Sequence, residues 1–396
     1  MIRGNIKLEN PERFAKSHTI SKSKIDIAVQ VTLEKLERSL PKWTDSFANS
    51  YTVDFKYPQI TNCDWICGMQ TGTYWLAYEM SGNRKFRDLA EKQLFSYKER
   101  LEKRIGVDDH DVGFVYMPSC AAAYKITGNE EARQLALDAA EYYYHTSFSK
   151  RGGFIQRGWN WGCPEGCRTM MDTLMNVSFL FWAGNEAGKE EYIDAAISQL
   201  KITEQCLIRE DGSSFHHYQF DPQTFQPVYG LTWQGYSDDS CWSRGQAWGV
   251  YGFPIAYSYC KEEFLVNLHR DVTYYLLNKL PEDLIPYWDF ELTGNKDVVR
   301  DSSTGVIAVC GMHEMCKNLS EKEPQKRIFE NASAQMLEAV IDQCTEDIGR
   351  EYEGLICHVT HGFPQKQGID ECAVYADYFY LEALMRFINP AWERYW

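Results

Sequence analysis

Apolar and polar positions follow one another along the chain in the pattern of paired amphipathic helices. An apolar helix ends in a short turn that carries glycine or charge, and a second helix rich in alanine and leucine follows. Three segments show this pattern most sharply: 74–94, 121–140 and 179–200. Looser copies cover 256–277 and 312–340, and a first amphipathic helix is expected from Ser23 toward Leu40.

The sharp copies predict helical hairpins that repeat along the chain. Their turn glycines, Gly82, Gly128 and Gly188, lie 46 and 60 residues apart, a spacing typical of such repeats. Long aromatic and glycine-rich segments separate the hairpins: 108–118, 152–168, 212–252 and 287–305. We expect an all-α fold in which six hairpins close into an (α/α)6 barrel, with these segments building a site on one face. An open solenoid is the alternative, although no polar capping repeats are evident.

Composition narrows the class of protein. A hydrophobic content of 44% excludes disorder, and no apolar run is long enough to cross a membrane. A net charge of −15 without a basic stripe argues against nucleic-acid binding. The 13 scattered cysteines and the polar start of the chain predict reduced thiols and a cytoplasmic location. Residues 1–22 are predicted to form a polar lead-in, and residues 23–396 a single catalytic domain.

Two acidic positions are candidates for chemistry. Asp108, Asp109, His110 and Asp111 are followed at once by apolar residues, which predicts a cluster where the backbone enters the core. Asp172 is a lone acid in the apolar run 168–176, which we expect to be helical. Carboxylates close to apolar walls and to one another have shifted pKa values, as acid–base catalysis requires. A solvated loop for the first cluster and a helix-packing role for Asp172 are the alternatives.

Other catalytic signatures are absent from the sequence. There is no dinucleotide or phosphate-binding glycine motif, His313-Glu314 is not followed by a histidine in register, and no serine has a nucleophile-elbow context. The cysteine pairs 63/67 and 163/167 lack the usual zinc spacing, so no metal and no cofactor are predicted. What remains is a pair of carboxylates with aromatic, Arg, His and Gln neighbours, which indicates glycoside chemistry.

The same residues carry a resemblance to a known family. From Asp64 onward, and in the right order, the chain is similar to the unsaturated glucuronyl hydrolases of glycoside hydrolase family 88. The matching motifs are Asp64-Trp65, 108–114, 168–176, 211–216, 234–249, 300–303 and 377–384. The resemblance implies an (α/α)6 barrel and a substrate left by a polysaccharide lyase, an oligosaccharide of the glycosaminoglycan type with a 4,5-unsaturated uronic acid at its non-reducing end. The implied reaction hydrates the C4=C5 enol ether and thereby releases the sugar.

The resemblance also implies roles for individual residues. Asp172 matches the general acid and base, which we expect to have a raised pKa, and Asp111 matches the second essential carboxylate. The implied substrate-binding residues are Trp65, His110, His216, Gly230, Thr232, Gln234, Arg244 and Trp248. Structural roles remain open for several of them: a hydrogen bond for His110, a loop cap for His216, core packing for Trp248, and for Arg244 an internal ion pair with Asp238 or Asp239.

Departures from the family pattern leave the detailed substrate open. The expected stacking tryptophan near position 158 is shifted to Trp159 or Trp161, and a serine–lysine run that accompanies sulfated substrates is replaced by 362–367, with Lys366 offset. An unsaturated rhamnogalacturonyl hydrolase and a non-catalytic glycan-binding toroid are therefore kept as alternatives. Nothing in the sequence bears on the oligomeric state.

Overall fold

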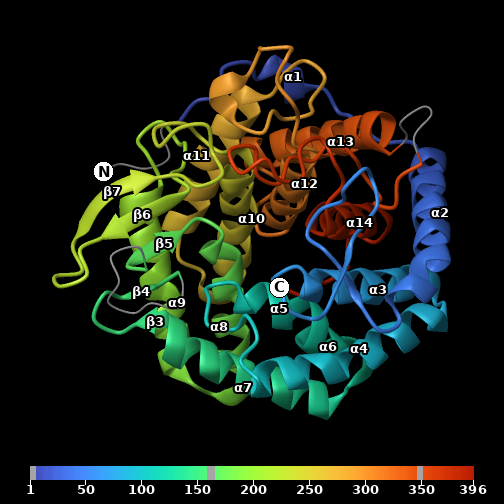
Figure 1. Ribbon diagram of the computed structural model, residues 1–396. Helices are drawn as coiled ribbons and strands as arrows, with labels where there is room; N and C mark the ends of the chain where they lie inside the picture. The colour runs from blue at the N-terminus through green and yellow to red at the C-terminus, as the bar shows by residue number, and fades with distance from the viewer. Residues whose placement is uncertain (1–5, 158–165, 346–350) are drawn as a thin grey trace.

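The protein is a ring of helices in two layers (Figure 1). A computed structural model describes residues 6–157, 166–345 and 351–396. The inner layer consists of α3 (Cys67–Ser81), α5 (Val112–Tyr116) continued by α6 (Ala122–Thr127), α8 (Thr173–Ala187), α10 (Ser243–Cys260), α12 (Ser302–Cys316) and α14 (Val374–Ile388). The outer layer consists of α2 (Lys22–Ser39), α4 (Arg84–Glu102), α7 (Glu130–Ser147), α9 (Glu190–Ile202), α11 (Phe264–Lys279) and α13 (Pro324–Cys344).

The predicted (α/α)6 barrel is confirmed. Five inner helices are each followed by the outer helix that packs on them, and α14 packs on α2 from the other end of the chain. Contacts between α14 and α3 then close the ring. Inner helices such as α12 are buried almost along their whole length, whereas outer helices such as α4 bury one face, as expected for a core between the two layers.

The predicted turn glycines end inner helices. Gly82, Gly128 and Gly188 follow α3, α6 and α8 with φ of 67°, 71° and 66°, a left-handed conformation that glycine adopts without steric cost. In two of the three turns, the residue after the glycine is an asparagine that caps the outer helix. The side chains of Asn83 and Asn129 accept hydrogen bonds from the backbone N–H groups of Lys85 and Ala132, which caps α4 and α7.

Glycines also allow the inner helices to approach one another closely. A Cβ atom at Gly311 of α12 would lie 2.4 Å from the carbonyl oxygen of Val250 in α10. A Cβ atom at Gly113 of α5 would lie 2.8 Å from the Cα atom of Asn176 in α8. Backbone packs against backbone at both contacts, so these positions fix the spacing of the ring.

The centre of the ring is filled by side chains. Trp396, the last residue of the chain, lies at the end marked C in the middle of Figure 1 and is buried against Phe114 of α5 and Phe379 of α14. Arg386 of α14 is fully buried and pairs with Glu382 on its own helix and with Glu314 of α12. A buried guanidinium with two carboxylate partners is costly to disrupt because removing one partner leaves a charge uncompensated. These contacts tie neighbouring inner helices together.

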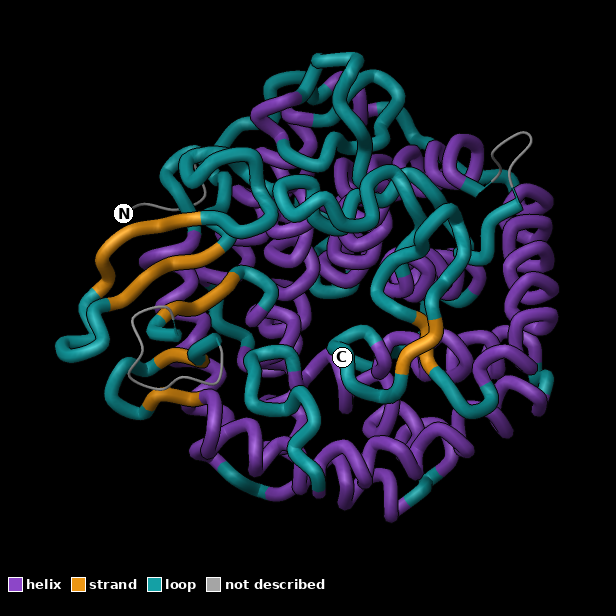
Figure 2. Tube along the Cα trace, in the orientation of Figure 1, coloured by secondary structure: helices purple, strands orange, loops and turns teal. Residues whose placement is uncertain are grey.

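The segments between hairpins contain short strands that an all-α prediction did not include (Figure 2). The pairs are β1 (Phe47–Ala48) with β2 (Gln59–Ile60) and β3 (Phe148–Ser149) with β4 (Phe154–Ile155). A three-stranded antiparallel sheet joins β5 (Arg168–Met170), β6 (His217–Phe220) and β7 (Pro227–Leu231). The helix expected over 168–176 is therefore wrong in its first part, because residues 168–170 pair with β6 and α8 begins only at Thr173.

Shorter helical elements complete the chain. They are α1 (Glu12–Ala15), η1 (Leu40–Trp43), the π-turn η2 (Met117–Ala121) that joins α5 to α6, η3 (Thr203–Leu207) and η4 (Phe290–Leu292). The described part of the lead-in packs on the ring, with Phe14 buried and its carbonyl accepting from the side chain of Asn331 in α13. The division at residue 22 stays a prediction. None of the described helices is both long and apolar enough to span a bilayer.

Adding one methyl group to α12 tests whether close helix contacts hold the ring. Gly311→Ala should lower the free energy of unfolding by about 1–3 kcal/mol, because the new Cβ overlaps the backbone of α10. Gly305→Ala on the same helix is the control, since its Cβ would have no neighbour closer than 3.7 Å. Urea denaturation of both variants measures the difference, and equal stabilities would contradict this account of the helix packing.

Candidate active site

Asp111 and Asp172 lie at the N-terminal ends of two neighbouring inner helices. Asp111 immediately precedes α5, and Asp172 immediately precedes α8. The sequence-based placement of Asp172 inside a helix was therefore wrong. At a helix N-terminus a carboxylate faces the positive end of the helix dipole, and its side chain points out of the helix rather than into the packed ring. The two hairpins thus bring both acids to one face, as predicted.

One imidazole ring joins these acids to a third. The Nε2 atom of His110 lies 3.3 Å from Asp111 Oδ1 and 3.2 Å from Asp172 Oδ1. The Nδ1 atom forms a short contact with Asp109 Oδ1, which also accepts the backbone N–H of His110 at 2.7 Å. The histidine side chain is 3% exposed. Both ring nitrogens therefore face carboxylate oxygens in a site shielded from water.

This arrangement determines which groups carry protons. Burial alone would lower the pKa of His110, but the three carboxylates outweigh it and raise the pKa well above its ordinary value. Burial raises the pKa of Asp111 to about 7, with the charges of Asp172 and Asp109 adding to the rise. Near neutral pH the cluster therefore contains an imidazolium and a carboxyl group that is about half protonated.

The pKa values of the other two acids move in the opposite direction. Burial favours protonation of Asp109 and Asp172, but the charge of His110 and its hydrogen bonds outweigh burial and lower both pKa values, that of Asp109 to about 2. The expectation that the pKa of Asp172 is raised is therefore wrong for the unliganded protein. The physical reason is the imidazolium, whose proximity the sequence did not reveal.

Asn176 of α8 holds the two helix ends in register. Its side-chain Oδ1 accepts the backbone N–H of Phe114 at 2.8 Å, and its Nδ2 donates to the Asp172 carbonyl at 3.2 Å. The same Nδ2 lies 3.4 Å from Asp111 Oδ1. The amide thus ties α5 to α8 directly beneath the acids, at the contact where Gly113 allows the two backbones to approach.

The acids open into a cavity of about 240 Å³. Seven of the predicted site residues line it: Asp111, Asp172, Trp65, His110, Gln234, Arg244 and Trp248. Further lining residues were not singled out as site residues from the sequence: Asp109, Phe114, Arg157, Met170, Trp233, Trp242, His361, Gln365 and Gln367. The site is therefore a small polar pocket with aromatic walls at one end of the ring.

Arg244 is engaged inside the protein. Its guanidinium pairs with Asp301, which is completely buried, and donates to the carbonyl oxygens of Thr360 and His361. The structural alternative of an ion pair with Asp238 or Asp239 was thus wrong in its partner, since Asp301 is brought close by the start of α12. Arg244 still borders the cavity, but Asp301 balances its charge.

Three predicted residues lie behind the wall of the cavity. His216 is buried, its Nδ1 atom is 3.3 Å from Thr232 Oγ1, and burial lowers its pKa to about 3. Gly230 lies on β7, where a Cβ atom would come within 2.2 Å of the Phe215 ring. Gly230 therefore allows close packing of a side chain, and His216 and Thr232 support Trp242 and the loop that carries Gln234.

Comparisons with known proteins identify the family. A family model described as Glycosyl Hydrolase Family 88 matches residues 39–347. The chain belongs to glycoside hydrolase family 88. An unsaturated chondroitin disaccharide hydrolase of Streptococcus pneumoniae (strain ATCC BAA-255 / R6) is 41% identical over 390 residues, covering 98% of each chain. The recognised family and the predicted enzyme class, a glycoside hydrolase, are confirmed.

Solved structures of unsaturated glucuronyl hydrolases are also similar to this chain. The crystal structure of an unsaturated glucuronyl hydrolase from Streptococcus agalactiae has a TM-score of 0.95 and 36% identity, and covers 100% of both chains. A variant of the S. agalactiae enzyme in complex with dGlcA-GalNAc6S has a TM-score of 0.88 and 34% identity, again with full coverage of both chains. The likeness spans the whole length of the chain.

Aromatic side chains of this family member divide between cavity wall and core. Trp65 is partly exposed and stacks on Tyr375 with ring centroids 5.4 Å apart. Trp248 borders the cavity but is only 2% exposed and packs against Phe114 and Phe379, so it mainly fills the core. Trp159 and Trp161 lie outside the described residues. Lys366 is exposed and does not line the cavity, although its neighbours Gln365 and Gln367 do.

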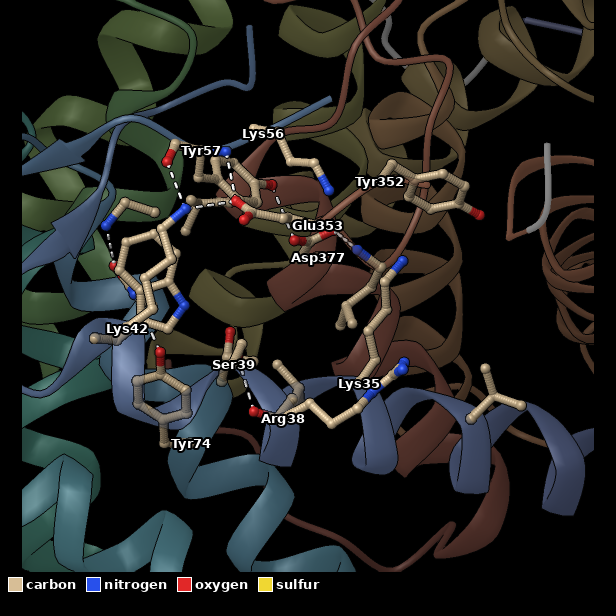
Figure 3. A pocket seen from close by; sticks show the side chains of 18 of the residues that line it. Lys35, Arg38, Ser39, Lys42, Lys56, Tyr57, Tyr74, Tyr352, Glu353 and Asp377 are labelled. Atoms are coloured by element: carbon tan, nitrogen blue, oxygen red, sulfur yellow. Dashed lines mark hydrogen bonds and ion pairs between the residues drawn. The ribbon is translucent and has the colours of Figure 1, made fainter. Parts of the chain in front are cut away.

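A larger cavity of about 610 Å³ lies between α2, α3 and α14 (Figure 3). Asp377 in this cavity accepts hydrogen bonds from the Tyr57 hydroxyl at 2.9 Å and from the Leu355 backbone N–H at 2.6 Å. Asp377 thus anchors a loop to α14. Lys42 pairs with Glu353. Glu353 also accepts the backbone N–H of Tyr57 at 2.7 Å. Both acids thus hold the backbone and side chains around the cavity in place, and the chemistry is assigned to the smaller cavity.

The acid cluster also has the donor types of a metal site. Ligand atoms of Asp109, His110 and Asp111 lie within 4.8 Å of one another. However, both nitrogens of His110 lie close to carboxylates, which suits a positively charged ring better than a neutral metal ligand. The absence of a metal and of a cofactor stays a prediction.

The opposite pKa shifts of two neighbouring acids predict opposite effects on stability. Asp111 holds a proton up to about pH 7 in the folded protein but only to about pH 4 when unfolded, so folding loses stability as pH rises between these values. Asp111→Asn removes this loss. As pH rises through that range, the free energy of unfolding of the variant should therefore increase relative to that of the wild type, by up to about 1.4 kcal/mol per pH unit.

Asp109→Asn is the matched control. Because the pKa of Asp109 is lowered to about 2, its ionised form stabilises the fold throughout the range above pH 4, and the amide should be less stable than the wild type by a constant amount from pH 5 to 8. Urea denaturation of the three proteins at several pH values measures both effects. Parallel pH profiles for the two variants would contradict the assigned protonation states.

Proposed function

We propose that this protein removes a 4,5-unsaturated uronic acid from the non-reducing end of oligosaccharides of the chondroitin type. The observation that carries the proposal is the pair of carboxylates, Asp111 and Asp172, within 3.3 Å of one histidine nitrogen on the wall of a small cavity. The 41% identity to an unsaturated chondroitin disaccharide hydrolase supports the choice of substrate.

The chemistry follows from the substrate's double bond. The C4=C5 bond lies next to the ring oxygen, so it is an enol ether and its C4 carbon accepts a proton. Protonation gives an oxocarbenium ion at C5, and water adds there. The resulting hemiketal opens, the anomeric carbon becomes an aldehyde, and the remaining sugar leaves as an alcohol. No displacement at the anomeric carbon is required, so one acid that later acts as a base is sufficient.

Asp172 is proposed as this acid and base. In the unliganded cluster the shared proton resides on Asp111 and not on Asp172. A bound uronate brings a further negative charge close to both acids, which favours protonation of Asp172. Asp172 then donates the proton to C4 and, as a carboxylate, accepts one from the attacking water. Asp111 and His110 keep the proton within the cluster.

The shape of the cavity supports action at chain ends. Phe114 and Trp248 line it and pack against each other, and Phe114 in turn packs on Trp396 in the centre of the ring. A volume of about 240 Å³ is below the usual range of about 300–1,000 Å³ for ligand pockets, so it accommodates a terminal sugar rather than the interior of a long chain. Trp65 offers a flat face for a sugar ring.

The rim of the cavity is proposed to hold the second sugar. Two loops meet there: Gln234 donates to the carbonyl oxygen of His361 at 2.6 Å, and Gln365 donates to that of Trp233. Trp233 is 57% exposed and offers a stacking surface. The amide groups of Gln365 and Gln367 suit the hydroxyl and N-acetyl groups of an amino sugar.

The location and the binding partners of the protein are also proposed. The described cysteines are free, most of them buried, which supports a cytoplasmic location. The net charge of −15 supports the prediction that the protein does not bind nucleic acid. An oligosaccharide with an unsaturated uronic acid is the proposed partner, and no cofactor is invoked.

Replacing the proposed acid tests its role. Asp172→Asn should lower turnover at least about 1,000-fold while substrate still binds, because the amide keeps the shape and cannot donate a proton to carbon. Asp111→Asn should also lose orders of magnitude. Loss of the ultraviolet absorbance of the C4=C5 bond measures turnover. Asp239→Asn, at an exposed acid, is the control, and near-normal rates in either active-site variant would refute the assignment.

A panel of substrates tests the proposed specificity. Unsaturated glucuronyl N-acetylgalactosamine, with and without sulfate, should be consumed with kcat/KM at least about tenfold higher than an unsaturated rhamnogalacturonan disaccharide, a difference of about 1.4 kcal/mol in transition-state binding. The expected reason is the amide-rich rim. A preference for the rhamnogalacturonan substrate would support the alternative hydrolase, and binding without consumption would support a glycan-binding toroid.

A further inference from the structure

An anionic substrate needs a positive charge that the catalytic cluster does not provide. Three carboxylates, Asp109, Asp111 and Asp172, line the cavity together with the imidazole of His110. The other histidine of the lining, His361, adds no charge, because burial lowers its pKa to about 3. All three acids contact the imidazole of His110, so its charge is used inside the cluster. A uronate carboxylate entering here would meet net negative charge unless another cation faces it.

Arg244 does not supply that cation. Asp301 balances its charge, and its Nη1 and Nη2 atoms also donate to the carbonyl oxygens of Thr360 and His361. The guanidinium and its acid are 2% and 0% exposed. Pulling Arg244 toward a ligand would leave Asp301 buried without its partner, which is costly.

Arg157 is the other arginine on the cavity wall. It follows β4, and two hydrogen bonds hold the backbone there: Gln156 N–H donates to the Ser147 carbonyl at 2.8 Å, and Arg157 N–H donates to the Arg168 carbonyl at 2.9 Å. Among the described residues, no acid forms an ion pair with its guanidinium. Its charge nevertheless acts on the cluster, where it contributes to lowering the pKa values of Asp109 and Asp172.

We infer that Arg157 binds the carboxylate of the unsaturated uronate and makes the enzyme specific for the free acid. This inference rests on the proposed function. The carboxylate is attached to C5, one bond from the carbon that is protonated, so a cation on the wall beside Asp111 and Asp172 lies within its reach. A guanidinium offers paired N–H donors that match a carboxylate.

The role assigned to Arg157 is recognition rather than proton transfer. The substrate carboxylate is charged before, during and after hydration of the double bond. A cation that pairs with it therefore stabilises bound substrate and transition state to a similar extent, and its loss mainly raises KM. This separates Arg157 from Asp172, whose loss is expected to lower kcat.

A pair of substrates and two variants test the inference. The substrates are an unsaturated chondroitin disaccharide and its uronate methyl ester. Arg157→Gln should raise KM for the acid about 10- to 100-fold, change kcat by less than about threefold, and leave the ester unaffected. Arg157→Lys keeps the charge and should fall between wild type and Arg157→Gln. The control is Arg151→Gln, at an exposed arginine nearby in the chain.

The possible outcomes separate failure of the role assigned to Arg157 from failure of the proposed function. An unchanged ratio of acid to ester activity in Arg157→Gln overturns the inference while leaving the proposed function intact. Turnover of neither substrate by the wild type overturns the proposed function and the inference with it. If Arg157→Gln does not fold, the salt dependence of the wild type decides: KM for the acid should rise with ionic strength and KM for the ester should not. Equal salt dependence of the two overturns the inference.

Discussion

The site depends on one buried imidazole surrounded by acids. His110 contacts Asp109 through one ring nitrogen and Asp111 and Asp172 through the other. Its positive charge keeps two of these acids ionised, while burial, with the crowding of negative charge in addition, raises the pKa of the third and leaves the proton there. Without the imidazolium, three carboxylates in a site shielded from water would repel one another strongly. The histidine thus makes the cluster both stable and able to hold a mobile proton.

The ring of helices makes this contact possible. Asp111 and Asp172 come from different hairpins, and they meet because α5 and α8 are adjacent in the inner layer and begin at the same end of the ring. Gly113 lets the two backbones touch, and Asn176 bonds across the contact. The aromatic core, from Phe114 to Trp396, fills the centre of the ring, and Phe114 also lines the cavity into which the acids open.

Much of this architecture could be predicted from the sequence because it depends on local signals. Glycine followed by asparagine at 82–83 and 128–129 marks the end of one helix and the start of the next. Long-range pairing could not be predicted in the same way. Nothing near Arg244 in the sequence points to Asp301, and only the antiparallel pairing of β5 with β6 shows that Asp172 precedes its helix. No described acid pairs with Arg157, and this has no sequence signature, since it depends on which side chains the fold brings close to the guanidinium.

The protonation state of His110 tests the central claim most directly. Nitrogen-15 NMR of histidine-labelled protein, with the His110 signal assigned by its absence in His110→Gln, reports whether one or both ring nitrogens carry a proton. The account predicts that both remain protonated at pH 8, well above the ordinary histidine pKa of about 6.5. A ring that loses a proton near pH 6.5 would show that the three carboxylates do not share an imidazolium, and would contradict the proposed order of protonation.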